Sequence, residues 1–221
     1  MFIGYYNYTV LLTYFGLCSA VYGMMQAMKN DYRTAIICLL ICGLCDMFDG
    51  MIARTNKTRS EDAKSFGVQI DSLCDLVCFG VFPVIIGFAL SPASWFTVLA
   101  AAFFVLAAVI RLGYFNVEEM NRMGGSADKR HYYTGLPVTA SALIMPMVAL
   151  ITTLKGLHLP FIYPLGLAIT GVLNISRFRV RKPYTVGIVC MIVVGALVFY
   201  LAYRYGGSIT CMKPGTYPTN V

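Results

Sequence analysis

Charged side chains are scarce in this chain of 221 residues: Asp, Glu, Lys and Arg together make up 12% of it. Soluble proteins carry roughly 25% charged residues, so the chain has about half the usual supply for a water-exposed surface. Histidine occurs twice and tryptophan once, whereas hydrophobic residues reach 58% and the mean hydropathy is +0.71. This composition excludes a disordered chain, a coiled coil and a free-standing nucleic-acid-binding protein. It predicts an integral membrane protein.

Long stretches of the sequence carry no Asp, Glu, Lys or Arg at all: 1–28, 76–110, 131–154, 156–176 and 183–203. Each stretch reaches the roughly 20 residues that a helix needs to cross a bilayer. The longest one suits two helices, because Pro92 and its flanking serines favour a turn. With a further span at 33–53, we expect an all-α bundle of about seven transmembrane helices in a single domain, 1–221. Their expected limits are 7–28, 33–53, 66–89, 94–115, 134–154, 158–176 and 183–204.

The distribution of positive charge predicts the orientation of the bundle in the cell membrane. Twelve of the 17 Lys and Arg residues fall in the last turns of the second, fourth and sixth expected helices or in the segments that follow them. Excess Lys and Arg marks the cytoplasmic side. We therefore expect a multi-pass protein with a cytoplasmic N-terminus.

Eight cysteines include Cys42 and Cys45 in C-x-x-C spacing, which could indicate a redox or metal site. This pair lies within an apolar helix without further cysteine or histidine partners nearby. Free cysteine behaves as a small hydrophobic residue, so we interpret the cysteines as packing residues.

Four of the ten acidic residues lie inside expected membrane spans, at Asp46, Asp49, Asp71 and Asp75. A carboxylate at the centre of a membrane helix costs about 2.5–3.5 kcal/mol on insertion scales, so such residues indicate function. The spacings of three and four residues place each pair on one face of its helix. Because the two helices are antiparallel and joined by the segment 55–65, their acids should lie at similar depths. We expect a cluster of four carboxylates in the cytoplasmic half of the membrane.

Carboxylate oxygens prefer hard divalent cations, and four of them suit two ions. Small residues beside the acids, Gly50, Ala53 and Gly67, would let a ligand approach closely, although small residues also serve helix packing in membranes. The guanidinium of Arg54 suits a phosphate oxygen. These features point to a site that binds a phosphate compound through divalent metal ions.

Eight of these residues form one pattern across two helices: Asp46-x-x-Asp49-Gly50-x-x-Ala53-Arg54, then Gly67-x-x-x-Asp71-x-x-x-Asp75. The pattern resembles the signature of the CDP-alcohol phosphotransferases, integral membrane enzymes of phospholipid synthesis. The segments 70–83, 110–117, 134–137 and 176–179 are similar to the versions found in phosphatidylserine synthases within that family. The resemblance covers roughly residues 5–183. It implies a six-helix core, one extra helix at about 183–204, a tail at 205–221 and a homodimer.

The resemblance implies transfer of a phosphatidyl group from CDP-diacylglycerol to the hydroxyl of L-serine, with release of CMP. It assigns two Mg²⁺ or Mn²⁺ ions to Asp46, Asp49, Asp71 and Asp75, and the general base to Asp75. The implied CDP-lipid-binding residues are Asp46, Asp49, Gly50, Ala53, Arg54 and Gly67. For the serine acceptor we favour Arg111 and Asn116, because a carboxylate pairs with a guanidinium and an ammonium with an oxygen. Alternatively, Arg111 is a positive-inside anchor at a helix end.

Three points remain open in the sequence. The twelve residues between Arg54 and Gly67 make a longer loop than the family pattern usually has, which leaves its nucleotide contacts undefined. Glycerol 3-phosphate or an inositol phosphate is an alternative acceptor, for which Arg111, Lys129 and Arg130, or Arg177 and Arg179, could bind a second anion. A divalent cation transporter is an alternative class, but all four acids lie in one membrane half and no inverted repeat follows.

Overall fold

The computed structural model describes residues 10–53, 60–91, 94–123, 132–177, 179–181 and 185–209. At 50–53, 122–123, 132–134, 179–181, 185–192 and 208, only the backbone is described. The helices are α1 (Leu11–Met28), α2 (Tyr32–Ala53), α3 (Glu61–Asp75), α4 (Phe82–Leu90), α5 (Trp95–Met123), α6 (Ser141–Leu154), α7 (Leu159–Ile175) and α8 (Thr185–Tyr205). A π-helical segment, Leu76–Val81, joins α3 to α4. Within the described ranges the chain therefore forms seven helical rods, as the sequence predicts.

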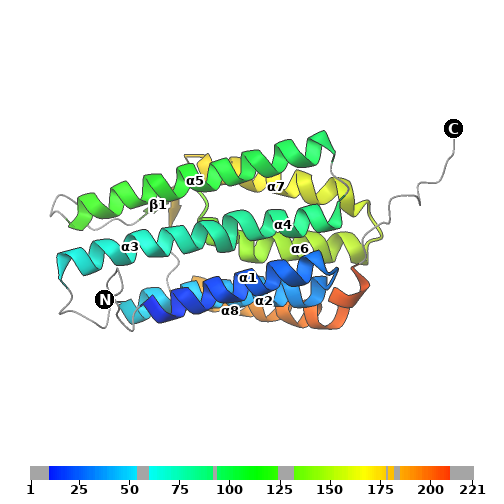
Figure 1. Cartoon of the computed structure of the whole chain (residues 1–221), viewed down its shortest axis with the longest axis horizontal. Helices are drawn as coiled ribbons and strands as arrows, with labels where there is room; N and C mark the ends of the chain where they lie inside the picture. Colours follow the sequence, from blue (N-terminus) through cyan, green and yellow to red (C-terminus); the bar gives the residue numbers. More distant parts are fainter. Residues whose placement is uncertain are drawn as a thin grey trace.

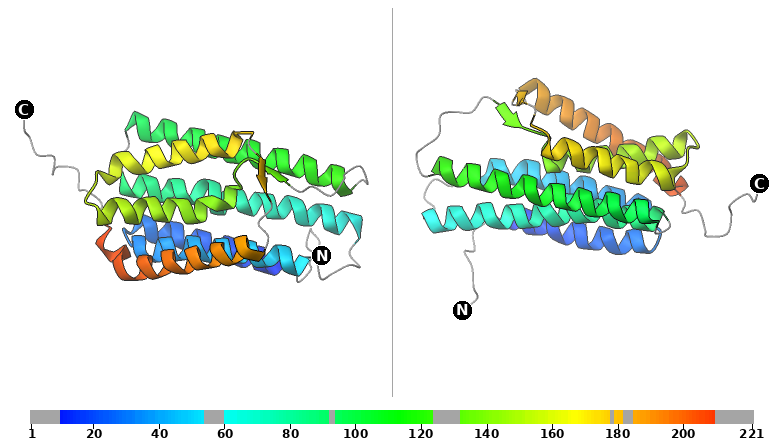
Figure 2. Two further views of the ribbon diagram at one scale, coloured as in Figure 1. Left: turned by 180° about the vertical axis from the view of Figure 1, so that it is seen from behind. Right: turned by 90° about the horizontal axis from the view of Figure 1, so that it is seen from above.

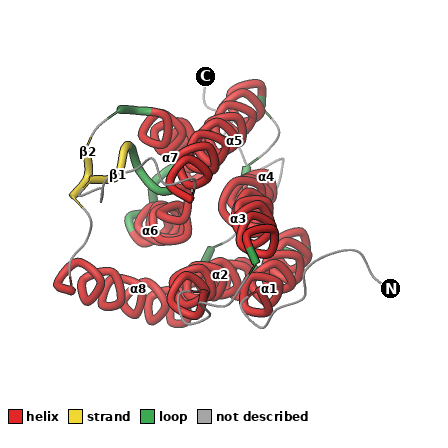
Figure 3. The backbone as a smooth tube through the Cα atoms, turned by 90° about the vertical axis from the view of Figure 1, so that its left-hand side faces the viewer, coloured by secondary structure: helices red, strands yellow, loops and turns green. Residues whose placement is uncertain are grey.

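The rods lie side by side in three layers (Figures 1 and 3). Helices α1, α2 and α8 form one outer layer, α5 and α7 form the other, and the α3–α4 rod and α6 lie between them (Figure 2). The end of α2, the start of α3 and the end of α5 lie at the same end of the molecule. This end therefore carries both halves of the acidic pattern.

The surface of the bundle is apolar. Leu11–Met28, Glu61–Leu90 and Trp95–Asn121 are long and apolar enough to cross a membrane, and shorter apolar helices cover Val138–Leu154, Leu159–Ile175 and Val193–Tyr205. Large apolar side chains that are more than half exposed include Trp95, Leu99, Phe161, Ile169 and Val193. An apolar surface over several helices is what a bundle surrounded by lipid requires. The fold is thus consistent with an integral membrane protein.

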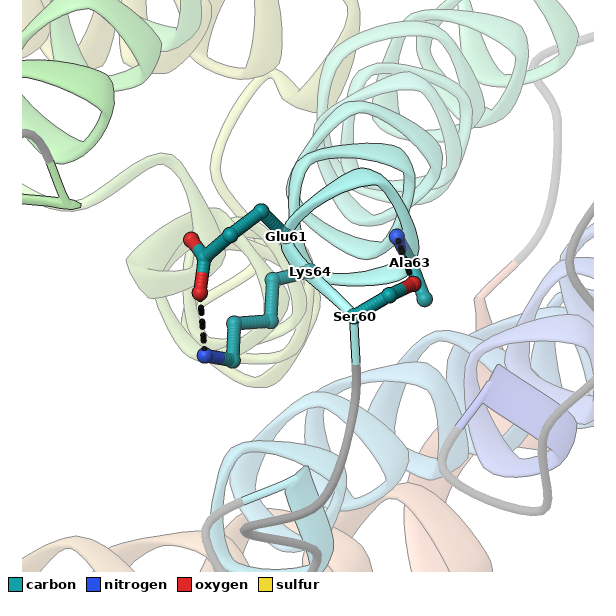
Figure 4. Close-up of polar contacts among 4 residues, drawn as sticks. All are labelled: Ser60, Glu61, Ala63 and Lys64. Carbon is teal, nitrogen blue, oxygen red and sulfur yellow. Dashed lines mark hydrogen bonds and ion pairs between the residues drawn. The ribbon is translucent and has the colours of Figure 1, made fainter.

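Helix α3 begins at Glu61, five residues before the expected start at 66. The side chain of Ser60 accepts a hydrogen bond from the backbone N–H of Ala63, at 3.3 Å, which caps the first turn (Figure 4). Glu61 and Asp62 place negative charge at the positive end of the helix dipole. Lys64 pairs with Glu61 at 2.7 Å on the exposed side of this turn. Capping therefore extends the helix beyond the apolar segment from which its start was predicted.

The α3–α4 rod changes its winding directly after Asp75. The π-helical turns at Leu76–Val81 precede Pro83, which has no N–H to donate to the carbonyl one turn earlier, that of Phe79. The hydroxyl of Ser141 donates to this carbonyl at 2.9 Å, and the hydroxyl of Tyr163 donates to the carbonyl of Pro83 at 3.0 Å. Helices α6 and α7 thereby stabilise the irregular segment that follows the last acid of the pattern.

A short antiparallel ribbon was absent from the prediction. Strand β1 (Tyr132–Thr134) pairs with β2 (Arg179–Arg181), with Tyr133 opposite Val180. The expected helix at 134 begins only with the 3-10 turn Val138–Ala140, because Gly135 has a φ of +75° and Pro137 is extended. A Cβ at Gly135 would lie 2.9 Å from the carbonyl oxygen of Ser176. The start at 134 was therefore wrong, because this glycine turn packs against the end of α7.

Of the remaining expected limits that fall within the described ranges, the end of α5 differs most, and the others agree within two residues. Helix α5 continues to Met123 rather than ending at 115, so its last two turns extend beyond the apolar stretch. The six cysteines whose side chains are described, Cys18, Cys38, Cys42, Cys45, Cys74 and Cys78, are free thiols, and all but Cys18 are buried. This agrees with their interpretation as packing residues.

Candidate metal centre

The acidic residues of α2 and α3 converge. Each of Asp46, Asp49 and Asp71 offers one carboxylate oxygen, and these oxygens all lie within 4.8 Å of one another. Asp49 is buried, with 7% exposure, and the other two are half-buried. The antiparallel α2–α3 pair thus brings three of the four acids of the pattern to one place.

Asp75 lies one helical turn after Asp71 and stands outside this group of three. Its half-buried carboxyl interacts electrostatically with Asp46, Asp71 and Asp49. Asp75 is therefore close enough to the group of three for its charge to interact with theirs. It directly precedes the π-helical segment.

The donor set fits a hard divalent cation. All the candidate ligands are carboxylate oxygens, which suit Mg²⁺, Mn²⁺ or Ca²⁺. Among the described residues, neither Asp46 nor Asp71 forms an ion pair with a lysine or arginine. A bound cation would supply the positive charge that clustered carboxylates in a half-buried position require.

The structure describes the small and basic residues of the pattern to different extents. Gly50 and Ala53 lie in the last turns of α2, where only the backbone is described, and Gly67 lies one turn before Asp71 on α3. Arg54 lies outside the described residues.

Asn116 forms hydrogen bonds to α3, the helix that carries Asp71 and Asp75. Its side-chain oxygen accepts from the hydroxyl of Ser72 at 2.5 Å, and its side-chain nitrogen donates to Gln69 at 3.3 Å. Ser72 and Gln69 were not among the predicted site residues. Their position beside Asp71 was the signal available in the sequence.

Arg111 is buried within α5, with 8% exposure, and α5 continues for twelve residues beyond it. Its Nε donates to the carbonyl of Leu136 at 3.3 Å, and its guanidinium lies 6.0 Å from the ring centre of Phe115. Arg111 therefore lies within α5 and not at its end, where the alternative of a positive-inside anchor placed it. Asn116 follows Arg111 by five positions along α5, so their side chains leave the helix about 140° apart. Arg111 bonds to Leu136, whereas Asn116 bonds to α3.

Helix α1 contributes a contact that the sequence pattern did not reveal. The hydroxyl of Thr13 donates to Oδ2 of Asp49 at 2.9 Å. The available signal was a hydroxyl residue on the face of α1 that otherwise carries Gly16, Ala20, Gly23 and Ala27.

Comparison with known proteins identifies the family. Residues 6–175 match the family model described as CDP-alcohol phosphatidyltransferase, and this match contains every residue of the acidic pattern. The chain belongs to the CDP-alcohol phosphatidyltransferase family. Its apolar helices and this membership together indicate an integral membrane protein. Helix α8 lies outside the residues of the family match.

Individual relatives of this chain carry related names. The chain is 38% identical over 139 residues to a CDP-diacylglycerol–serine O-phosphatidyltransferase of Saccharomyces cerevisiae, covering 60% of this chain and 48% of the relative. It is 31% identical over 134 residues to an archaetidylserine synthase of Methanothermobacter thermautotrophicus, covering 60% of this chain and 53% of the relative. A Helicobacter pylori CDP-diacylglycerol–serine O-phosphatidyltransferase is 27% identical over 181 residues, covering 76% and 72%. The chain thus matches about half the length of the first two relatives.

Proposed function

We propose that this protein transfers the phosphatidyl group of CDP-diacylglycerol to the hydroxyl of L-serine and releases CMP. The observation that carries the proposal is the convergence of Asp46, Asp49 and Asp71 within a chain of this family. The names of its relatives, from a yeast, an archaeon and a bacterium, support serine as the acceptor.

The four aspartates would hold Mg²⁺ or Mn²⁺, and two ions suit their number. When bound, the ions neutralise the diphosphate and stabilise the departing CMP. Gly50, Ala53, Arg54 and Gly67 would bind the nucleotide side of the lipid together with Asp46 and Asp49. Small residues there allow the ligand to approach the helix backbones, and Arg54 suits a phosphate oxygen.

Asp75 is the proposed general base. The serine oxygen forms a bond to the phosphorus that carries the diacylglycerol, and the bond from that phosphorus to the CMP oxygen breaks. The carboxylate of Asp75 takes the proton that the serine hydroxyl loses, and CMP leaves with the electron pair. Its position one turn from the group of three suits a residue that contacts the acceptor.

Arg111 and Asn116 remain our proposed acceptor-binding residues. Ser72 and Gln69 use one lone pair of the Asn116 oxygen and one proton of its nitrogen, so each atom keeps a further hydrogen-bonding position. Asn116 is therefore oriented and can still contact the serine ammonium or carboxylate. The Arg111 guanidinium, whose Nε donates to the carbonyl of Leu136, would pair with the carboxylate.

The proposed orientation has the metal centre in the cytoplasmic half of the cell membrane and the N-terminus in the cytoplasm. The support is the excess of Lys and Arg in the segments after the second, fourth and sixth rods. Substrate could then enter from the cytoplasm while the acyl chains remain in the lipid. A homodimer, typical of the family, is the proposed assembly.

The test is CMP release by purified protein in detergent, supplied with CDP-diacylglycerol and Mg²⁺ or Mn²⁺. Serine, glycerol 3-phosphate, an inositol phosphate or no acceptor is added in parallel. We expect release with serine, loss of release in EDTA and recovery when either metal is returned. Release with another alcohol alone would reassign the acceptor. No release by folded protein under any condition would contradict the enzyme and lead to metal-flux measurements in liposomes.

A further inference from the structure

The acidic pattern lies on α2 and α3, yet a side chain from α1 contacts it. Thr13 donates its hydroxyl proton to Oδ2 of Asp49 at 2.9 Å, across 36 positions of sequence. Both groups are buried, with 8% exposure for Thr13 and 7% for Asp49. A hydrogen bond to a carboxylate in such a position is stronger than one between neutral groups, and water has little access to replace it.

The position of Thr13 is fixed by close packing one turn further along α1. A Cβ at Gly16 would lie 3.3 Å from the Cβ of Cys45, so the two helices approach closely at this glycine. The thiol of Cys42 donates to the carbonyl of Gly16 at 3.2 Å. Gly16 therefore sets the distance between α1 and α2 next to the point where Thr13 meets Asp49.

We propose that Thr13 is a positioning residue for the metal centre and that it acts by fixing the carboxylate of Asp49. This inference rests on the proposed function only in requiring that the aspartates bind a divalent cation. A carboxylate that ligates a metal is commonly oriented by a hydrogen bond from a neighbouring group, and loss of such a partner typically weakens metal binding about 10–100-fold. The hydroxyl of Thr13 has this relation to Asp49, and it comes from a helix outside the acidic pattern.

The experiment measures the dissociation constant of Mn²⁺ for purified protein without substrates, from the electron paramagnetic resonance signal of the free ion. Thr13→Val preserves shape and removes the hydroxyl, whereas Thr13→Ser keeps the hydroxyl. The matched control is Thr152→Val on α6, since Thr152 is also buried from water but its hydroxyl bonds to its own helix at Val148.

We expect Thr13→Val to raise the dissociation constant about tenfold. Thr13→Ser and Thr152→Val should stay within about threefold of the unmodified protein. In an Asp49→Asn background, Thr13→Val should have little further effect, because the two residues act through one contact. This double variant also separates the role of the hydroxyl from a general loss of folding.

Three results would overturn the inference: an unchanged constant in Thr13→Val, equal weakening by valine and serine, or additive effects in the double variant. Protein that binds no Mn²⁺ at all would overturn it together with the metal centre. Protein that binds Mn²⁺ normally but releases CMP with another alcohol would contradict only the serine acceptor, and the role of Thr13 would still be decided by the variants.

Discussion

At the scale of single residues, Asp75 differs from the other three aspartates because it lies outside the group that could share one ion. We predict that Asp75→Asn lowers kcat for CMP release by about 10²–10⁴-fold, as expected for loss of a general base. Affinity for CDP-diacylglycerol should change little, because the other acids and the nucleotide-side residues are retained. Near-normal turnover in this variant would contradict the assignment, and Glu61→Gln, at the exposed start of α3, is the matched control.

Asn116 and Ser72 allow a second prediction at this scale. If Asn116 contacts serine and Ser72 only orients it, Asn116→Ala should raise KM for serine about tenfold or more, as expected for loss of a hydrogen bond to a charged group, worth about 1.5–3 kcal/mol. Ser72→Ala should raise it less. KM for CDP-diacylglycerol should be nearly constant in both variants. Steady-state kinetics with each substrate varied in turn measures this, and equal increases in both KM values would reduce Asn116 to a connection between α3 and α5.

At the scale of helices, the packing of α1 against its neighbours depends on glycine. A Cβ at Gly23 would overlap the ring of Phe82 and would lie 2.7 Å from the Cβ of Cys38. Gly23→Ala must therefore displace α1, at a cost of about 1–3 kcal/mol for overpacking. A Cβ at Gly113 on α5 would meet no atom within 4 Å, so Gly113→Ala should be neutral or slightly stabilising.

The measurement for this pair is the temperature at which half of the detergent-solubilised protein is lost from the monodisperse peak of a sizing column. Gly23→Ala should lower it by several degrees, whereas Gly113→Ala should not. If both variants changed this temperature equally, the effect of the substitutions would come from helix propensity rather than from close packing at Gly23.

The helices also show what the sequence can and cannot predict. The length of the apolar stretches predicted where the rods lie. Helix periodicity predicted that the acids of α2 and α3 lie close together, and Asp46, Asp49 and Asp71 do. The predicted starts of α3 and α6 were wrong because they were taken from apolar length alone. Helix α3 starts earlier because Ser60 caps it, and α6 starts later because Gly135 turns the chain.

The contacts between helices were beyond sequence reasoning for a different reason. Spacing along one helix determines which residues share a face, but it does not determine which neighbour that face meets. Thr13 and Ser72 were therefore missed although each lies on a helix that was correctly located. The ribbon of β1 and β2 was missed because three-residue strands carry too little alternation to be recognised.

At the scale of the whole molecule, an odd number of membrane crossings places the two ends of the chain on opposite sides. The candidate metal centre lies toward the end of the bundle where α2 ends and α3 begins. The sequence from 54 to 64, between these two points, carries Arg54, Lys57, Arg59 and Lys64. Because such segments are retained in the cytoplasm, all seven rods should cross the membrane with this end inward. The apolar surface alone would permit either orientation, so the prediction rests on the distribution of Lys and Arg.

Reporter fusions in a bacterial host test this orientation. Alkaline phosphatase, active only outside the cytoplasm, should be active when fused after Val221, and green fluorescent protein at that position should be dark. Fusions of the chain truncated after Lys57, which follow only α1 and α2, should give the opposite pattern. Fluorescence at both positions would mean that α8 or another rod does not cross, and an inverted result at both would place the carboxylates outside. Fluorescence after Lys57 is the part of this pattern that serine needs in order to reach Asp75 from the cytoplasm.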